Sequence, residues 1–125
     1  MTTSIPSAIK LHKRSRLLEI QFGHESFQLE AEFLRVLSPS AEVRGHGNPV
    51  LQTGKLNVAI TGVEMVGQYA IKLIFDDGHD SGIYDWSYLY ELCREKEAMW
   101  DEYIQALRGA GASRDPDVSV VRFFQ

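Results

Sequence analysis

The chain has 125 residues and a formal net charge of -4 at pH 7, and 44% of its residues are hydrophobic. This length and composition are typical of one globular domain with its own core. The acidic balance argues against a dedicated binder of nucleic acid or of anionic membranes, because such proteins carry a basic excess. The single cysteine excludes an internal disulfide, and residues 1–8 lack the apolar core of a secretory signal. We therefore expect a cytoplasmic protein with no nucleic-acid partner and no membrane contact.

The first part of the chain predicts a hairpin followed by a short helix. Apolar and polar residues alternate from residue 9 to residue 22, and again over residues 27–30, as they do along strands. Between them, residues 23–26 (GHES) are typical of a turn. Residues 31–37 are good helix formers, and Pro39 ends this helix because the residue before a proline is pushed away from helical geometry.

Further strands are predicted in the middle of the chain. Residues 56–66 are rich in β-branched side chains and predict a strand with a bulge at Gly62. Residues 69–75 have the clearest strand pattern. Asp77-Gly78 suits a two-residue type I′ turn, so we expect residues 80–84 to return antiparallel.

A long amphipathic helix is predicted after Asp85, which is a suitable N-cap. Apolar residues then recur at three- and four-residue spacing over about six turns. These positions are Trp86, Leu89, Leu92, Cys93, Met99, Trp100, Tyr103, Ile104 and Leu107. The residues that we expect to be buried against the sheet are Leu89, Leu92, Cys93 and Met99. Gly109 and Gly111 end the helix.

The order of strands, short helix, strands and long helix is typical of an α+β fold. We expect one domain over residues 9–108: an antiparallel sheet with a short helix and a long C-terminal helix packed on one face. Residues 1–8 predict a disordered N-terminus, and residues 109–125 a flexible C-terminal tail. Phe123 and Phe124 in the tail predict either a segment that folds back onto the domain or a docking peptide for a partner. We favour a mobile tail, because its glycines raise the entropy cost of a fixed path.

Several polar residues are candidates for a functional site. The segment Asp76-Asp77-Gly78-His79-Asp80 combines three carboxylates with an imidazole, all of them groups that bind metals or transfer protons. The simpler interpretation is a hairpin turn, in which the backbone favours Asp and Gly. His46, in a glycine-rich loop, is a candidate contact residue together with Asp77 and Asp80. Cys93 has apolar neighbours and is interpreted as a buried structural cysteine.

Other motifs are weaker. Residues 10–16 (KLHKRSR) form a basic cluster that could bind phosphates, but the overall acidity favours a solvated turn. No nucleophile–base pair and no cofactor-binding loop is visible in the sequence, so an enzyme is the weakest of the function classes and no catalytic residue is assigned.

Three parts of the chain together are similar to one known family. They are EFLR at 32–35 with SPSAE at 38–42 and GHG at 45–47, then VGQYA at 66–70, then FDDGHDSGIYDWSYL at 75–89. On these residues the chain resembles the γ-butyrobetaine hydroxylase-like N-terminal domain, a bacterial family of unknown function, over residues 9–108. In the hydroxylases this domain precedes an oxygenase domain that carries iron and 2-oxoglutarate. We expect no oxygenase chemistry here, because the chain ends before such a domain could begin.

The resemblance also implies a zinc module. Its three cysteine positions fall on Ser38, Ser40 and Val43 in this sequence, and its histidine falls on His79. A hydroxyl is a poor zinc ligand and valine is none, so we expect no stoichiometric zinc and no other cofactor. We expect His79 to contact residues 38–46 through hydrogen bonds instead.

Two hypotheses of function follow. Members of the family are attached to ATPases that handle iron–sulfur clusters, which implies a non-catalytic accessory or interaction module with an unidentified protein partner, linked to iron–sulfur or metalloprotein systems. The alternative is a metal-binding domain in which His79 holds zinc or iron, with His46 or a neighbouring aspartate as a further ligand.

Overall fold

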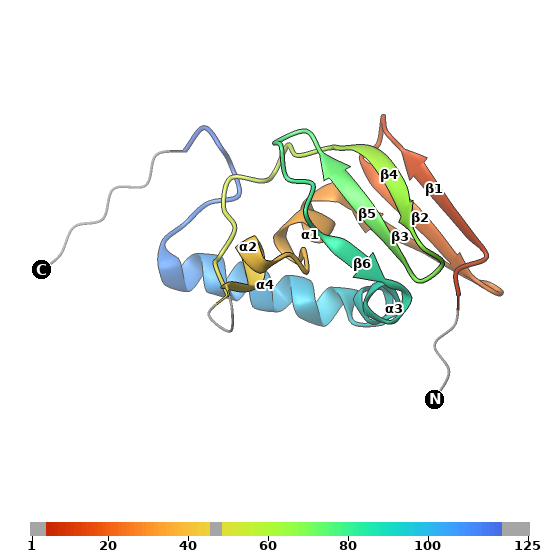
Figure 1. The fold of residues 1–125 in the computed structure, drawn as a ribbon. Helices are drawn as coiled ribbons and strands as arrows, with labels where there is room; N and C mark the ends of the chain where they lie inside the picture. Colours follow the sequence, from red (N-terminus) through yellow and green to blue (C-terminus); the bar gives the residue numbers. More distant parts are fainter. Residues whose placement is uncertain (1–4, 46–48, 119–125) are drawn as a thin grey trace, which may run out of the picture.

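The computed structural model describes residues 5–45 and 49–118 and confirms the α+β fold. The elements in this part of the chain, seen in Figure 1, are β1 (Ala8–His12), β2 (Leu17–Phe22), β3 (Glu25–Glu30), α1 (Ala31–Val36), α2 (Ala41–Arg44), β4 (Ile60–Val66), β5 (Ala70–Phe75), β6 (Ile83–Asp85), α3 (Trp86–Arg94) and α4 (Lys96–Ala110). Among the described residues, no helix has the length and apolar character needed to cross a membrane.

The strands form two antiparallel sheets of three strands each, in the orders β1-β2-β3 and β4-β5-β6, where we expected one sheet. Strands β1 and β4 approach each other, but no ladder of hydrogen bonds joins them in the part of the chain that the structure describes. Figure 1 shows the strands on one side of the molecule and α4 along the other. The bulge predicted at Gly62 is confirmed by a shift of register between Ile60 and Gly62.

The main core lies where the sheets meet α1 and α3. Strand β2 alternates between buried and half-buried positions, with Leu18 and Ile20 pointing into the core. Every residue of α1 is buried. From α3, the side chains of Leu89, Leu92 and Cys93 complete this core, which confirms the predicted face of that helix.

The single long helix that we expected is present as two helices, α3 and α4, that meet at Glu95. Glu95 has φ -107° and ψ 17°, outside the helical range. Helix α3 packs on the main core, whereas α4 buries Tyr103 and Leu107 in a second cluster with Val36. The first turns of α4 also contact the main core, through Met99 and Trp100, before the helix reaches the second cluster. Met99, in the first turn of α4, is half-buried rather than mostly buried.

The segment after α4 runs along the domain, where we expected a flexible linker. Residues 109–110 form the end of α4, and Gly111 closes the helix in the left-handed conformation (φ 61°). Two backbone hydrogen bonds of 2.9 Å then join this segment to the chain before β4: Gly54 N–H to Ser113 O and Leu56 N–H to Arg114 O.

Arg114 fastens this segment to α1 and α4. Its Nε and Nη2 each lie 2.7 Å from a carboxylate oxygen of the buried Glu32. Its guanidinium also lies over the ring of Trp100, 5.0 Å from the centroid. The last apolar residues of the chain, Phe123 and Phe124, lie outside the described residues.

Candidate functional site

The turn after β5 brings His79 into the interior. Gly78 N–H donates to Phe75 O (3.2 Å) and Phe75 N–H donates to His79 O (2.9 Å), so the turn has three residues and not the two that we expected. Gly78 has φ 89°, which side-chain-bearing residues rarely adopt. The chain then continues without regular structure until β6 begins at Ile83, and His79 is left only 5% exposed.

His79 joins two loops, as predicted. Its Nε2 lies 2.8 Å from Ser38 Oγ and 3.4 Å from Ser40 Oγ, which confirms the expected contact with the loop after α1. Its Nδ1 lies 3.3 Å from Oε2 of Glu42, at the start of α2. Ser81 Oγ donates to Oε1 of the same Glu42 (3.1 Å) and ties the loops together a second time. We call Ser38, Ser40, Glu42 and His79 the His79 cluster.

Nε2 of His79 is bonded to the Ser38 hydroxyl, which also accepts a hydrogen bond from Ser40 N–H (3.3 Å). Because a hydroxyl can donate to Nε2 or accept from it, this bond is compatible with either tautomer of the imidazole. Nδ1 faces Glu42, but the angle is poor, and this nitrogen has no hydrogen-bond partner among the described residues. Burial lowers the pKa of His79, Arg35 acts in the same direction, and Glu42 partly opposes them. The imidazole is therefore neutral at pH 7.

Ser38 contacts His79, and His79 in turn lies beside Glu42, as a nucleophile, a base and an acid do in many hydrolases. The sequence did not reveal this arrangement. The Ser38 hydroxyl is nevertheless enclosed. Ser38 is 1% exposed, and a Cβ placed on Gly82 would lie 2.3 Å from its Oγ and 3.2 Å from the Tyr84 ring. On the Gly82 side there is no space for a substrate carbonyl beside this oxygen, and the hydroxyl serves as a hydrogen-bonding group between the two loops.

The His79 cluster does not fit the zinc module that the family resemblance implies. Where that module has three thiolates, this chain has two neutral hydroxyls and the buried side chain of Val43. Nε2 of His79 is already engaged by Ser38. Within residues 5–45 and 49–118, no three His, Cys, Asp or Glu side chains come together in a way that could hold a metal. One imidazole beside two hydroxyls is a poor donor set for zinc or iron.

Asp77 is the centre of an ion-pair network. Its Oδ2 accepts hydrogen bonds from Arg35 Nε (2.8 Å) and Lys55 Nζ (2.6 Å), and its Oδ1 accepts one from His79 N–H (3.1 Å). Burial alone raises the pKa of Asp77, but the three donors outweigh it and lower the pKa to about 2. Asp77 therefore orders the turn as a permanent carboxylate and is not available as an acid or base.

The other residues singled out in the sequence are not brought into this site. Asp80 is exposed. His46, Phe123 and Phe124 lie outside the described residues. Cys93 is a residue of α3 that is buried in the main core, and burial raises the pKa of its thiol to about 12.

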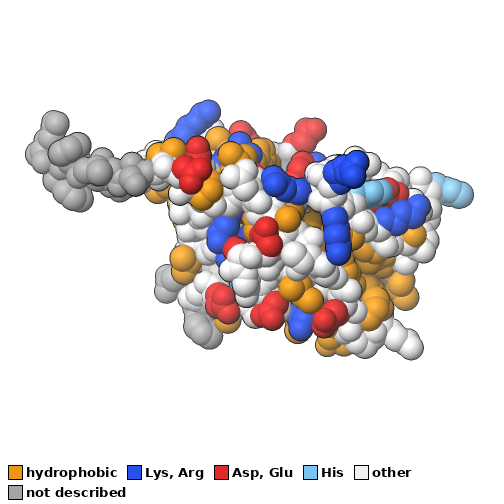
Figure 2. Space-filling view, turned by 90° about the horizontal axis from the view of Figure 1, so that it is seen from above, with side chains coloured by type: hydrophobic (Ala, Val, Ile, Leu, Met, Phe, Trp, Pro, Cys, Tyr) orange, Lys and Arg blue, Asp and Glu red, His pale blue; other side chains and the backbone are white. Residues whose placement is uncertain are grey.

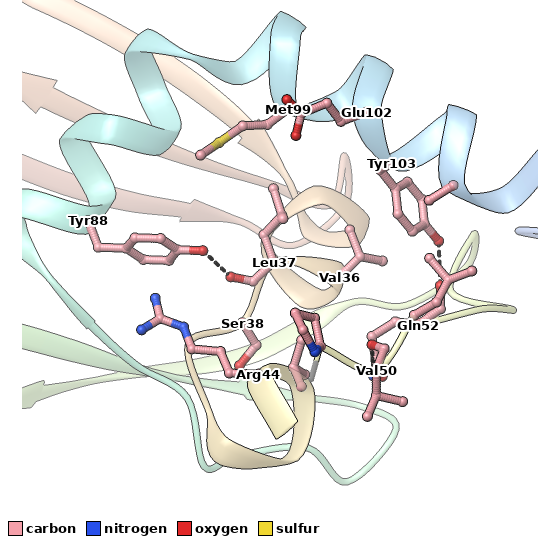
Figure 3. A pocket seen from close by; sticks show the side chains of 14 residues that line it. Val36, Leu37, Ser38, Arg44, Val50, Gln52, Tyr88, Met99, Glu102 and Tyr103 are labelled. Carbon is pink, nitrogen blue, oxygen red and sulfur yellow. Dashed lines mark hydrogen bonds between the residues drawn. The ribbon is translucent and has the colours of Figure 1, made fainter. Parts of the chain in front are cut away.

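A pocket of about 490 Å³, which we call the α4 pocket, opens between α2 and α4. Figure 3 shows Met99 and Tyr103 of α4 on one side, and Arg44 and Val50 on the other. Its apolar lining includes Val36, Leu37, Val43, Val50, Met99 and Ala106. The sequence carried a signal for it, since Met99, Tyr103 and Ala106 share one helix face, but the same spacing also predicts core.

Most polar groups of the α4 pocket are already engaged. The Tyr103 hydroxyl donates to Gln52 O (2.7 Å), and the Tyr88 hydroxyl donates to the backbone carbonyl that closes α1. The Arg44 guanidinium lies over the Tyr88 ring, 4.9 Å from its centroid. Glu102 is exposed on α4, so the two walls of the pocket carry opposite charges.

Residues 9–90 match a family described as gamma-butyrobetaine hydroxylase-like, N-terminal. Two NMR solution structures resemble the whole chain. The first is 60% identical, covers 99% of this chain and 100% of its own, and has a TM-score of 0.86. The second is 48% identical, covers 100% and 98%, and has a TM-score of 0.79.

A crystal structure of a protein of unknown function from Acidithiobacillus ferrooxidans, a member of the DUF971 family, is 36% identical. It covers 70% of this chain and 91% of its own, with a TM-score of 0.61. The search of curated proteins found no significant match to the chain. The sequence match and the shared fold show that the chain belongs to the γ-butyrobetaine hydroxylase-like N-terminal family.

Proposed function

We propose that this domain is a non-catalytic interaction module and that the α4 pocket is its contact site. The observation that carries the proposal is an open, mostly apolar pocket in a domain whose Asp77 carboxylate and Ser38 hydroxyl have structural roles. Asp77 is paired with Arg35 and Lys55, and the Ser38 hydroxyl is enclosed by Gly82. The volume of about 490 Å³ lies within the range of binding pockets in proteins.

The chemistry of the lining favours a short apolar segment of a partner protein. Both tyrosine hydroxyls at the pocket donate to backbone carbonyls, so the pocket offers few hydrogen bonds to a polar ligand. Apolar side chains would be stabilised against Val36, Val50 and Met99. Arg44 and Glu102 on opposite walls favour a segment with an acidic residue at one end and a basic residue at the other.

The family resemblance suggests which partners to test first. Related domains are attached to ATPases that handle iron–sulfur clusters, so proteins that handle such clusters, and other metalloproteins, are the first candidates. The partner would supply any metal, because the His79 cluster lacks suitable ligands.

A photo-crosslinking residue at Val50 tests this proposal in the full chain. Val50 lines the pocket and is 53% exposed, so replacing it leaves the core unchanged. The matched control carries the same residue at Tyr69, which is 59% exposed in the turn between β4 and β5 and lies outside the pocket. In cells we expect an adduct from position 50 and not from position 69, and mass spectrometry should map it to an apolar segment of the partner.

Two substitutions on α4 complete the test. Ala106→Glu places a charge in the pocket and should abolish the adduct. Ala98→Glu makes the same change at an exposed position of α4 outside the pocket and should leave the adduct intact. An adduct that survives Ala106→Glu, or one that forms equally at position 69, would contradict the proposal.

A further inference from the structure

A second surface lies between the two sheets and is independent of the α4 pocket. Strand β1 pairs only with β2, and β4 pairs only with β5, so each has one edge without a ladder partner in the described chain. These edges lie close together beside a groove of about 390 Å³. We call it the β1–β4 groove; its lining is Ile9, Leu11, Val63, Met65 and Ile71.

The groove is apolar and open to solvent. Met65 is 64% exposed, and a second hollow shared by Ile9 and Met65 continues toward Ile5, which is 67% exposed. Figure 2 shows hydrophobic side chains gathered at the end of the molecule that holds the strands, next to Lys and Arg side chains. The exposed apolar side chains that line this groove indicate a contact surface.

Positive charge lies at one end of the groove. The turn that follows β1 carries Lys13, Arg14 and Arg16, and Lys10 lies within β1, all of them exposed. Residues 8–18 contain no acidic side chain, and Glu19 of β2, opposite Lys10, contacts His12 at 2.9 Å. This local excess stands out in a chain whose net charge is -4, and it would attract a segment that carries acidic residues.

We propose that the β1–β4 groove binds an extended segment of a partner protein, which adds a strand to the open edge of β1. Its alternate apolar side chains would cover Leu11, Val63 and Met65, while its backbone completes the ladder. Antiparallel pairing places the N-terminal end of the segment beside the basic turn at residues 13–16. The segment is therefore apolar at alternate positions and acidic at its N-terminal end.

Three synthetic peptides test the proposal against the full-length, isotope-labelled chain by NMR titration. The first, EEEVTVTVT, has the proposed pattern. The second, KKKVTVTVT, keeps the apolar positions and reverses the charge. The third, EEEVTPTVT, keeps the charge and removes a ladder N–H. We expect the first peptide to shift amide signals of β1 and β4, to bind at least about tenfold more tightly than the other two, and to weaken with added salt.

Exposed variants locate the binding site. Met65→Asp should weaken binding of EEEVTVTVT, and Arg14→Glu should reduce the preference for it over KKKVTVTVT. Val50→Asp, an equally exposed change in the α4 pocket, should leave binding unchanged. Spectra without peptide check that each variant is folded.

Three outcomes would overturn the proposal: equal binding of the first two peptides, signal shifts confined to α4, or no binding by any peptide. A dimer in sedimentation that is lost in Met65→Asp would assign the groove to a second copy and would also overturn it. Failure here leaves the α4 pocket proposal intact, because that test depends on Val50 and Ala106.

Discussion

At the scale of single residues, His79 is the side chain on which the site depends. It connects to Ser38, 41 positions earlier, by a hydrogen bond of 2.8 Å. Burial lowers the pKa of this imidazole, so the folded state favours its neutral form. Ionisation of His79 is therefore coupled to stability.

The first prediction is that the folded state loses stability as the pH falls below about 6.5. Burial lowers the pKa of His79 in the folded protein relative to its ordinary value of 6.5. Between the pKa of His79 in the folded state and 6.5, the unfolded chain binds more protons than the folded chain. The free energy of unfolding therefore rises with pH in this range, by at most about 1.4 kcal/mol per pH unit. Urea unfolding between about pH 5.5 and 7.5 measures the slope. His79→Gln should flatten it, whereas the exposed His24→Gln should not; an unchanged slope in His79→Gln would contradict the prediction.

The second prediction concerns Gly82, where a methyl group would meet Ser38 Oγ at 2.3 Å. Gly82→Ala should lower the free energy of unfolding by about 1–3 kcal/mol, the usual effect of overpacking. In a Ser38→Ala background the same change should cost at least about 0.5 kcal/mol less, because the clashing oxygen is gone. Gly109→Ala, with open space around it, is the control and should not destabilise. Additive effects of the two substitutions would show that the contact is not tight.

The third prediction concerns metal. Elemental analysis of purified protein should find no stoichiometric zinc, because hydroxyls and valine stand where thiolates are needed. A triple variant, Ser38→Cys with Ser40→Cys and Val43→Cys, is the positive control and should take up about one zinc per chain. One tightly held zinc per unaltered chain, lost in His79→Ala, would refute the prediction.

At the scale of elements, the break between α3 and α4 divides one apolar stripe between two clusters. Leu92 of α3 lies in the main core at 0% exposure. Met99, one turn beyond the break, lines the α4 pocket and is half-buried. The two residues look alike in the sequence, but the break gives them different roles.

The fourth prediction tests that difference. Leu92→Ala should lower the free energy of unfolding by about 2–5 kcal/mol, the range for cavities in a core. Met99→Ala should have a clearly smaller effect, because its side chain already contacts solvent. Urea unfolding of both variants measures the two losses. Equal losses would place Met99 in the core and remove it from the pocket.

At the scale of the whole molecule, Arg114 connects the end of the described chain to its centre. The ion pair with Glu32 spans 82 positions in sequence and satisfies a buried carboxylate. The segment around Arg114 also covers Gly54 and Leu56, which precede the second sheet. One arginine therefore helps to hold both halves of the domain together.

The fifth prediction is that residues 113–116 are ordered in solution, with amide order parameters near ~0.85. Arg114→Ala should lower these values and should reduce the free energy of unfolding by about 1–3 kcal/mol, because Glu32 loses its partner. Adding Glu32→Gln to that variant should recover part of the stability, since no charge then remains buried. NMR relaxation and urea unfolding measure the two effects. Order parameters below ~0.6 in the unaltered chain would support the flexible linker that the sequence predicts.

Features that depend on neighbouring residues were predictable from the sequence. Asp85 caps α3 by accepting a hydrogen bond from Tyr88 N–H at 2.7 Å. Gly62 produces its bulge. The contact of His79 with the loop after α1 was also expected, from family resemblance and not from spacing.

Features that depend on distant residues were not predictable. Arg94, Glu95 and Lys96 are all good helix formers, so nothing local signals the break between α3 and α4. The residues that α4 packs against, such as Val36, lie far away in the sequence. In the same way, alternation near residue 9 and β-branched side chains over residues 56–66 indicate strands but do not say whether the edges of β1 and β4 pair, and so the division into two sheets was missed.

The burial of Cys93 has a kinetic consequence. It is the single thiol of the chain, and its pKa of about 12 leaves almost none of the reactive thiolate at neutral pH. An alkylating reagent can therefore modify it at an appreciable rate only after α3 has moved off the sheet. Every modified molecule marks one opening event, so the rate of alkylation reports how often the core opens, without any label being added to the chain.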